Sequence, residues 1–132
     1  MRALHPAAAA FALAIALGLP AQAQTMPDNV RVSGGMLTDA RGMTLYTFAN
    51  DKTPGQSACS GNCIKNWPAL AASANARPMG DWTGISREDG SRQWAYKGQP
   101  LYTLVKDAKP GDNTGDNVGN VWHTARPQRR AC

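Results

Sequence analysis

The feature that most constrains the fold of this chain is an internal repeat. Residues 45–51 read LYTFAND, and residues 101–107, which lie 56 positions later, read LYTLVKD. At the same offset a glycine precedes each copy and a Pro-Gly pair follows it, giving seven identities over the fourteen positions 42–55. Such a repeat implies that one supersecondary unit occurs twice. We therefore expect an architecture of two related halves.

Each copy of the repeat is typical of a strand followed by a turn. Leu, Tyr, Thr and Phe favour strands, and alternation along a strand places Tyr46 and Phe48 on the same face. In both copies an aspartate, Asp51 or Asp107, is followed by two residues and then by Pro-Gly, a pair that favours a tight turn. We expect each carboxylate to accept backbone N–H bonds and to cap its turn. A metal or substrate role for these aspartates is the alternative.

The rest of the chain predicts further strands and turns. Residues 29–48 show strand segments separated by short glycine-containing stretches, and residues 82–96 repeat this scheme around an Asp-Gly pair, which is a strong hairpin signal. A closing strand is expected over residues 118–124, whereas residues 69–76 are the one candidate for a turn or two of helix. We predict a small, mainly β, antiparallel domain made of two related hairpin units packed face to face, with little helix.

The N-terminus has the pattern of a secretory signal peptide. Arg2 precedes an apolar run over residues 7–19, and Ala21-Gln22-Ala23 offers a small-residue cleavage site. The order of charge, apolar run and small residues is that of a signal peptide, and the run is too short to span a bilayer. We expect residues 1–23 to be a Sec-type signal peptide that is cleaved near Ala23-Gln24.

Residues 24–132 are expected to form a single β domain, with the two repeats at about 30–70 and 82–127. The predicted export places this domain in the periplasm or outside the cell. No cysteine lies near the cleavage site, so we expect no lipid anchor. We also expect no transmembrane segment after removal of the signal peptide.

The charge balance argues against a nucleic-acid partner. The formal net charge is +5 at pH 7, and part of the positive excess lies at the tail in Arg126, Arg129 and Arg130. No motif combines aromatic and basic residues as nucleic-acid modules do. We interpret the tail as a solvated segment.

The cysteine pair carries the most distinctive chemistry. Cys59 and Cys63 are separated by three small or polar residues, and exported proteins form disulfides readily. We predict a local structural disulfide. The alternative is a periplasmic copper or redox carrier, because a thiolate pair suits Cu(I). Further ligands available to such a site are Met36, Met43, Met79 and His123.

Two other features could carry chemistry. Cys132 is left over, which predicts a free thiol or an intermolecular disulfide. The loop at 110–120 is rich in oxygen-bearing side chains, but Thr114, Asn117 and His123 depart from the Ca²⁺-binding EF-hand pattern. Because Gly, Asn and Asp are also selected by tight turns, we expect turns here, with a bound cation as the alternative.

Residues 36–127 resemble the bacterial secreted repeat lipoproteins, which share a Tyr-x-(Phe/Trp/Tyr)-x-x-Asp motif. The motif residues in the two copies are Tyr46, Phe48, Asp51, Tyr102 and Asp107. In the second copy Leu104 stands at the aromatic position. Other elements that resemble the family are Gly42, Cys59 and Cys63 before Trp67-Pro68, Asp89-Gly90, Tyr96, Gly98, and Pro110-Gly111-Asp112 before Trp122. The resemblance implies an exported cell-envelope protein and no established activity.

No complete catalytic constellation is visible in the sequence. His123 is the only histidine after residue 23, and Glu88 is the only glutamate. No nucleophile-elbow motif accompanies the histidine. We therefore predict no catalytic residue, no metal ligand and no cofactor. The predicted function is a non-catalytic binding or structural module, whose partner is an unknown envelope component or small ligand.

Overall fold

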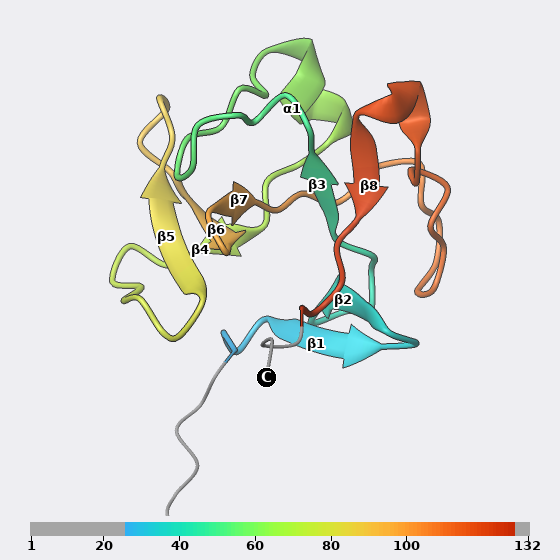
Figure 1. Cartoon of the computed structure of the whole chain (residues 1–132), viewed down its shortest axis with the longest axis horizontal. Coiled ribbons are helices and arrows are strands. Elements are labelled where there is room, and N and C mark those ends of the chain that lie inside the picture. The colour runs from blue at the N-terminus through green and yellow to red at the C-terminus, as the bar shows by residue number, and fades with distance from the viewer. Residues whose placement is uncertain (1–25, 129–132) are drawn as a thin grey trace, which may run out of the picture.

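The computed structural model describes residues 26–128 of the 132-residue chain. This part consists mainly of short β-strands joined by loops (Figure 1). In chain order its elements are β1 (Val30–Ser33), β2 (Met36–Asp39), β3 (Tyr46–Phe48), α1 (Asn62–Asn66), β4 (Ala71–Ala72), β5 (Trp82–Ser86), β6 (Arg92–Tyr96), β7 (Gln99–Pro100), the 3-10 turn η1 (Val118–Asn120) and β8 (Trp122–Thr124). The predicted signal peptide and Cys132 lie outside the described residues.

Two hairpins form where the sequence predicts them. β1 pairs with β2, and β5 pairs with β6, both in antiparallel register. The first hairpin turns at Gly34 and Gly35, whose φ angles are 59° and 79°, and a two-residue turn of this kind needs positive φ at both positions. The second turns through the Asp89-Gly90 pair. The predicted fold class, mainly β with antiparallel hairpin units and little helix, is confirmed.

The prediction of helix at residues 69–76 is wrong, because this segment contains β4. The Leu70 N–H donates to the Leu101 carbonyl at 2.9 Å, and the Leu70 carbonyl accepts the Trp94 N–H at 2.9 Å. These strand bonds to distant residues outweigh the helix propensity of an alanine-rich segment. The helix that does form, α1, lies between the first repeat motif and Trp67.

The two halves exchange their closing strands. β8, which ends the second half, pairs with β3 of the first half, and β4, which ends the first half, pairs with β6 of the second. Figure 1 shows β3 and β8 side by side, with α1 above them and the β4–β7 strands beside them. The halves are therefore interleaved rather than stacked as two separate units.

Backbone hydrogen bonds repeat this exchange in both halves. Leu45 and Leu101 occupy equivalent positions: each donates to a strand of its own half and accepts from the residue next to the closing strand of the other half. The bonds, given as N–H donor, carbonyl acceptor and N···O distance, are Leu45 to Leu37 (3.0 Å), Ala125 to Leu45 (2.8 Å), Leu101 to Trp94 (3.1 Å) and Leu70 to Leu101 (2.9 Å).

The two copies of the repeat, at Leu45-Tyr46 and Leu101-Tyr102, lie between two hydrophobic clusters. Leu45 and Leu101 are fully buried in one cluster, together with Trp82. Tyr46 and Tyr102 are fully buried in the other. Alternation along the strands accounts for this division, because neighbouring residues face opposite sides. We call the second group the aromatic cluster, and its buried members are Tyr46, Cys59, Trp67, Tyr102, Leu104 and Trp122.

Candidate functional site

Each repeat tyrosine bonds the repeat aspartate of the other copy. The Tyr46 hydroxyl donates to Asp107 Oδ2 at 2.6 Å, and the Tyr102 hydroxyl donates to Asp51 Oδ2 at 2.7 Å. The two tyrosines also pair through their backbones, with N···O distances of 2.7 and 3.0 Å. The motif therefore ties the halves together, since each half supplies the partner that the other needs.

The electrostatics of these pairs keep both tyrosines protonated. Burial raises the pKa of Tyr46 and of Tyr102 above the ordinary value, and the bonded carboxylates raise it further. Burial also raises the pKa of Asp51, although hydrogen bonds from Ala58 and Tyr102 oppose this shift. Both phenols therefore act as hydrogen-bond donors to a carboxylate at neutral pH.

The two aspartates also hold the loops that follow them. Asp107 Oδ1 accepts the Thr114 N–H at 3.0 Å and the Thr114 hydroxyl at 2.6 Å. Asp51 Oδ1 accepts the Ala58 N–H. In both cases the bond reaches seven residues ahead, past the Pro-Gly turn. The carboxylates therefore accept backbone N–H bonds, but they close a longer loop than the sequence suggests.

The aromatic position of the motif caps a stack of rings. The Trp67 and Trp122 ring centroids lie 3.8 Å apart with planes 1° apart, and Phe48 stacks on Trp122 at 4.2 Å. Leu104, which replaces the aromatic residue in the second copy, belongs to the same cluster. Trp67 and Leu104 crowd Gly115, where an added Cβ would lie 2.7 Å from the Trp67 ring. Little space therefore remains at this end of the cluster.

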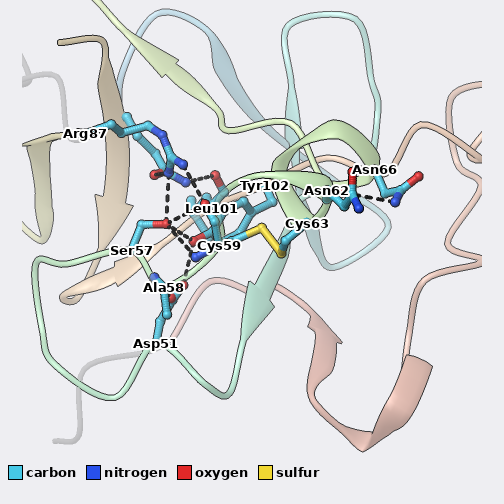
Figure 2. Close-up of a disulfide and its surroundings, with 11 residues drawn as sticks. Asp51, Ser57, Ala58, Cys59, Asn62, Cys63, Asn66, Arg87, Leu101 and Tyr102 are labelled. Carbon is cyan, nitrogen blue, oxygen red and sulfur yellow. Dashed lines mark hydrogen bonds between the residues drawn. A yellow bond between two sulfur atoms is a disulfide. The ribbon is translucent and has the colours of Figure 1, made fainter. Parts of the chain in front are cut away.

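Cys59 and Cys63 lie at disulfide distance beside this cluster, with their Sγ atoms 2.01 Å apart (Figure 2). Cys59 is fully buried, and Cys63, in α1, is half-buried. The Trp67 N–H donates to the Cys63 carbonyl at 2.9 Å, which joins the cysteine loop to the stacked rings. In the disulfide form neither sulfur is the thiolate that copper would need.

A directed chain of hydrogen bonds runs beside the disulfide (Figure 2). Arg87 Nη1 donates to Ser57 Oγ at 2.8 Å and to Gln93 Oε1 at 2.7 Å. Ser57 Oγ lies 2.7 Å from the Tyr102 hydroxyl, which in turn donates to Asp51. Because the tyrosine proton goes to the carboxylate, Ser57 is the donor in the middle bond. The chain thus joins a guanidinium to a carboxylate through two hydroxyls.

Two members of this hydrogen-bond chain, Ser57 and Arg87, line a cleft of about 520 Å³. The cleft is lined by loop residues 56–61, by Ile64 and by residues 86–89 at the turn of the β5–β6 hairpin. Most of these side chains are small or polar. We call this hollow the disulfide cleft, because Cys59 lies in its wall.

The equivalent loop of the second repeat is closed. Gly115 takes the place of Cys59 in the repeat alignment, and its buried N–H donates to the Tyr46 hydroxyl at 3.2 Å. At the loop of the first repeat, the hydroxyl of Tyr102 instead contacts the side chain of Ser57, which lines the cleft. The loop of the second repeat is therefore sealed by backbone over the Tyr46 hydroxyl, whereas the loop of the first repeat borders the disulfide cleft. Asp107 itself lines a separate hollow.

The remaining metal-ligand candidates are spread over the fold. Met79 packs against the hydrophobic cluster that contains Leu45 and Leu101, and Met43 lines a separate hollow near Pro110. His123 lies in β8 opposite Thr47. Within residues 26–128, no group of three or more His, Cys, Asp or Glu side chains could hold a metal ion.

The oxygen-rich loop at 110–120 uses its carboxylates in turns. Asp112 Oδ2 accepts the N–H groups of Ala108 and Lys109 at 2.9 and 3.1 Å. Asp116 Oδ1 accepts the Thr124 N–H at 3.0 Å. The two carboxylates therefore have backbone partners, Asp112 in the turn that precedes it and Asp116 in β8.

Sequence reasoning missed Ser57, Arg87 and Gln93. Arg87 and Gln93 flank the turn of the β5–β6 hairpin at diagonal positions, which lie on one face of a sheet. The contact between Arg87 and Gln93 could therefore have been predicted from the hairpin register. Nothing in the sequence indicates that Ser57 would meet them.

A family model described as a secreted repeat of unknown function matches the chain twice, over residues 30–71 and 83–126. The chain belongs to this secreted repeat family. Each match contains one copy of the Tyr–Asp motif, so the two repeats of the family are the two interleaved halves of the fold. Comparisons with curated proteins and with solved structures gave no match. No helix within the described residues is long and apolar enough to cross a membrane.

Proposed function

We propose that this protein is an exported, non-catalytic binding module of the cell envelope, with the disulfide cleft as its ligand site. The observation that carries the proposal is the difference between two copies of one motif. The Tyr46 hydroxyl lies behind a sealed loop, whereas the Tyr102 hydroxyl is bonded to Ser57 in the cleft wall. Folding alone accounts for the sealed copy. The open copy adds a cleft that folding does not require.

Export is supported by three independent features. The family is described as secreted, and residues 1–23 have the composition and order of a signal peptide. Cys59 and Cys63 lie at disulfide distance, and disulfides persist in oxidising compartments. We infer that the protein works in the periplasm or outside the cell.

A binding role is supported by the proton chemistry of the cleft. Ser57 is the hydroxyl best placed to act as a nucleophile, but such a residue needs a neighbouring base. Its partner Tyr102 has a raised pKa and already donates to Asp51, so Tyr102 cannot take the serine proton at neutral pH. Arg87 is a donor only. The network holds its members in place and leaves the cleft wall rigid.

A thermal-shift screen of small polar compounds tests the proposal. A ligand at 100 times its Kd stabilises a folded protein by about 2.7 kcal/mol, which corresponds to a shift of roughly 10–20 °C for a domain of this size. Amino acids, dipeptides, sugars and dicarboxylates would be screened against the protein and against Ser60→Trp. Ser60 is exposed in the cleft wall, so tryptophan there should fill the cleft.

We expect compounds that raise the melting temperature of the protein and fail to raise that of Ser60→Trp. Asn113→Trp, at an exposed site in the sealed loop, is the matched control and should respond as the parent does. Stabilisation that survives Ser60→Trp unchanged would place the ligand elsewhere, and a screen without a stabilising compound would also argue against the proposal.

A further inference from the structure

We infer that the disulfide cleft takes a ligand bearing a carboxylate group, and that Arg87 is the residue that binds it. The inference rests on the proposed function and names the chemical class of the ligand. It is based on how the guanidinium of Arg87 is held, on the charges around it and on where its unused donors lie.

The guanidinium is positioned by three neutral acceptors. Nη1 donates to Ser57 Oγ at 2.8 Å and to Gln93 Oε1 at 2.7 Å, and Nη2 donates to the Cys59 carbonyl at 2.6 Å. Figure 2 shows Arg87 directed at Ser57 and Cys59, next to the disulfide. Because Gln93 is fully buried and donates to the Leu101 carbonyl at 2.8 Å, its amide oxygen is fixed toward the arginine. The arginine is therefore preorganised.

The positive charge of Arg87 has no directly bound counter-ion. Among residues 26–128 the ion pairs are formed by Arg41, Lys97 and Lys109, and Arg87 forms none. Asp51 and Asp89 are near enough to interact with Arg87 electrostatically, but neither is hydrogen-bonded to it. Asp51 is bound instead by Tyr102 and Ala58. Because the direct hydrogen-bond partners of this half-buried guanidinium are all neutral, an anion can still bind it directly through a charge-assisted hydrogen bond.

Two N–H donors of Arg87 remain for a ligand. A guanidinium has five such donors, and the described hydrogen bonds use three of them. The side chain lines the cleft, so a group that enters the cleft can reach it. A carboxylate offers two oxygens to a planar guanidinium, and such charge-assisted bonds are shorter and stronger than neutral ones.

The acids of the hairpin turn bear on this assignment. Asp89 Oδ1 accepts the N–H and the hydroxyl of Ser91 at 2.9 and 2.6 Å, so its carboxylate is turned back on its own turn. Glu88 is exposed at the cleft and repels an incoming anion. Removal of the Glu88 charge should therefore strengthen carboxylate binding without disturbing the arginine.

A matched pair of probes tests the inference. N-acetylglycine carries a carboxylate, and N-acetylglycinamide has nearly the same shape without the charge. Each would be titrated into the ¹⁵N-labelled protein while the amide and arginine Nε resonances are followed. We expect saturable shifts with the acid at residues 57–61 and 86–89, and binding of the neutral amide weaker by about tenfold or more. Added salt should weaken binding of the acid.

Three variants complete the design. Arg87→Gln should weaken acid binding by about tenfold or more, Glu88→Gln should tighten it about two- to fivefold, and Arg41→Gln, at an exposed site outside the cleft, should leave it unchanged. If Arg87→Gln fails to fold, Glu88→Gln and the acid–amide pair still decide the question.

The outcomes separate the inference from the proposed function. Equal binding of acid and amide, or weaker binding by Glu88→Gln, would overturn the carboxylate assignment. If neutral compounds bind in the cleft and the acid does not, the carboxylate assignment is also overturned, but the proposed binding function is retained. If no compound binds in the cleft, both the carboxylate assignment and the proposed binding function are overturned.

Discussion

Replacement of the two repeat tyrosines by phenylalanine should have unequal effects, although the two positions are equivalent in the repeat. Tyr46→Phe removes a bond to Asp107, which is only 6% exposed, and also strands the buried Gly115 N–H. A lost bond to a charged group costs about 1.5–3 kcal/mol, and an unsatisfied buried donor costs about 1–3 kcal/mol. We expect Tyr46→Phe to lower the free energy of unfolding by about 3–5 kcal/mol.

Tyr102→Phe should cost less. Its hydroxyl partners, Asp51 and Ser57, are only partly buried, and Ser57 borders the cleft. Water can replace the lost bonds there, so we expect a cost of about 1–2 kcal/mol. The difference between the two variants should amount to at least about 4 °C in melting temperature.

Urea unfolding followed by tryptophan fluorescence measures both free energies, provided that the slope m is unchanged. Tyr96→Phe is the control, because its hydroxyl accepts only the exposed Gln128 N–H at 2.9 Å, and it should stay within about 0.5 kcal/mol of the parent. Equal costs for the two repeat tyrosines, or a larger cost at Tyr102, would refute the distinction between a sealed and an open copy.

Three further predictions concern stability. Gly115→Ala should destabilise the protein by about 1–3 kcal/mol, because the added Cβ would press on the Trp67 ring. Gly84→Ala is the control, because its Cβ would meet the movable end of Arg92 at the same distance of 2.7 Å. It should cost less in the same urea assay. Replacement of both Cys59 and Cys63 by serine should lower the free energy of unfolding by at most about 2 kcal/mol, as expected for so short a closed loop. Thiol titration of the oxidised parent should find neither cysteine free. A reduced pair that binds copper would favour the carrier hypothesis instead. Burial raises the pKa of Asp51, so its contribution to stability is fully present below the unfolded pKa and is lost as pH rises through the folded pKa. The stability of the parent relative to Asp51→Asn should therefore grow as pH falls from 7 toward about 4, and a pH-independent difference would show that burial does not perturb this carboxylate.

The fold class could be predicted because its signals are local. Gly34-Gly35 and Asp89-Gly90 specify turns by backbone conformation, and alternation in the repeat strands predicts two faces. The exchange of β4 and β8 could not be predicted, because both closing strands follow similar sequences. Local patterns do not distinguish pairing within a repeat from pairing between repeats.

The candidate site was less accessible to sequence reasoning. The repeat identifies the tyrosines and aspartates, but their pairing across the halves accompanies the antiparallel bridge between Tyr46 and Tyr102. Arg87 and Ser57 lie in different halves and meet where the two halves pack against each other. The charge of an arginine beside a predicted turn ordinarily indicates a solvated position, and here tertiary contacts with Gln93 and Cys59 place it in a cleft wall.

The most direct test of the binding-module account is a map of amide shifts on the ¹⁵N-labelled protein, titrated with the compounds that raise its melting temperature. The account predicts saturable shifts concentrated in residues 56–61 and 86–89, which line the disulfide cleft, with residues 113–117 of the sealed loop unaffected. Shifts that are centred on another face, or that are equal in the two loops, would contradict it.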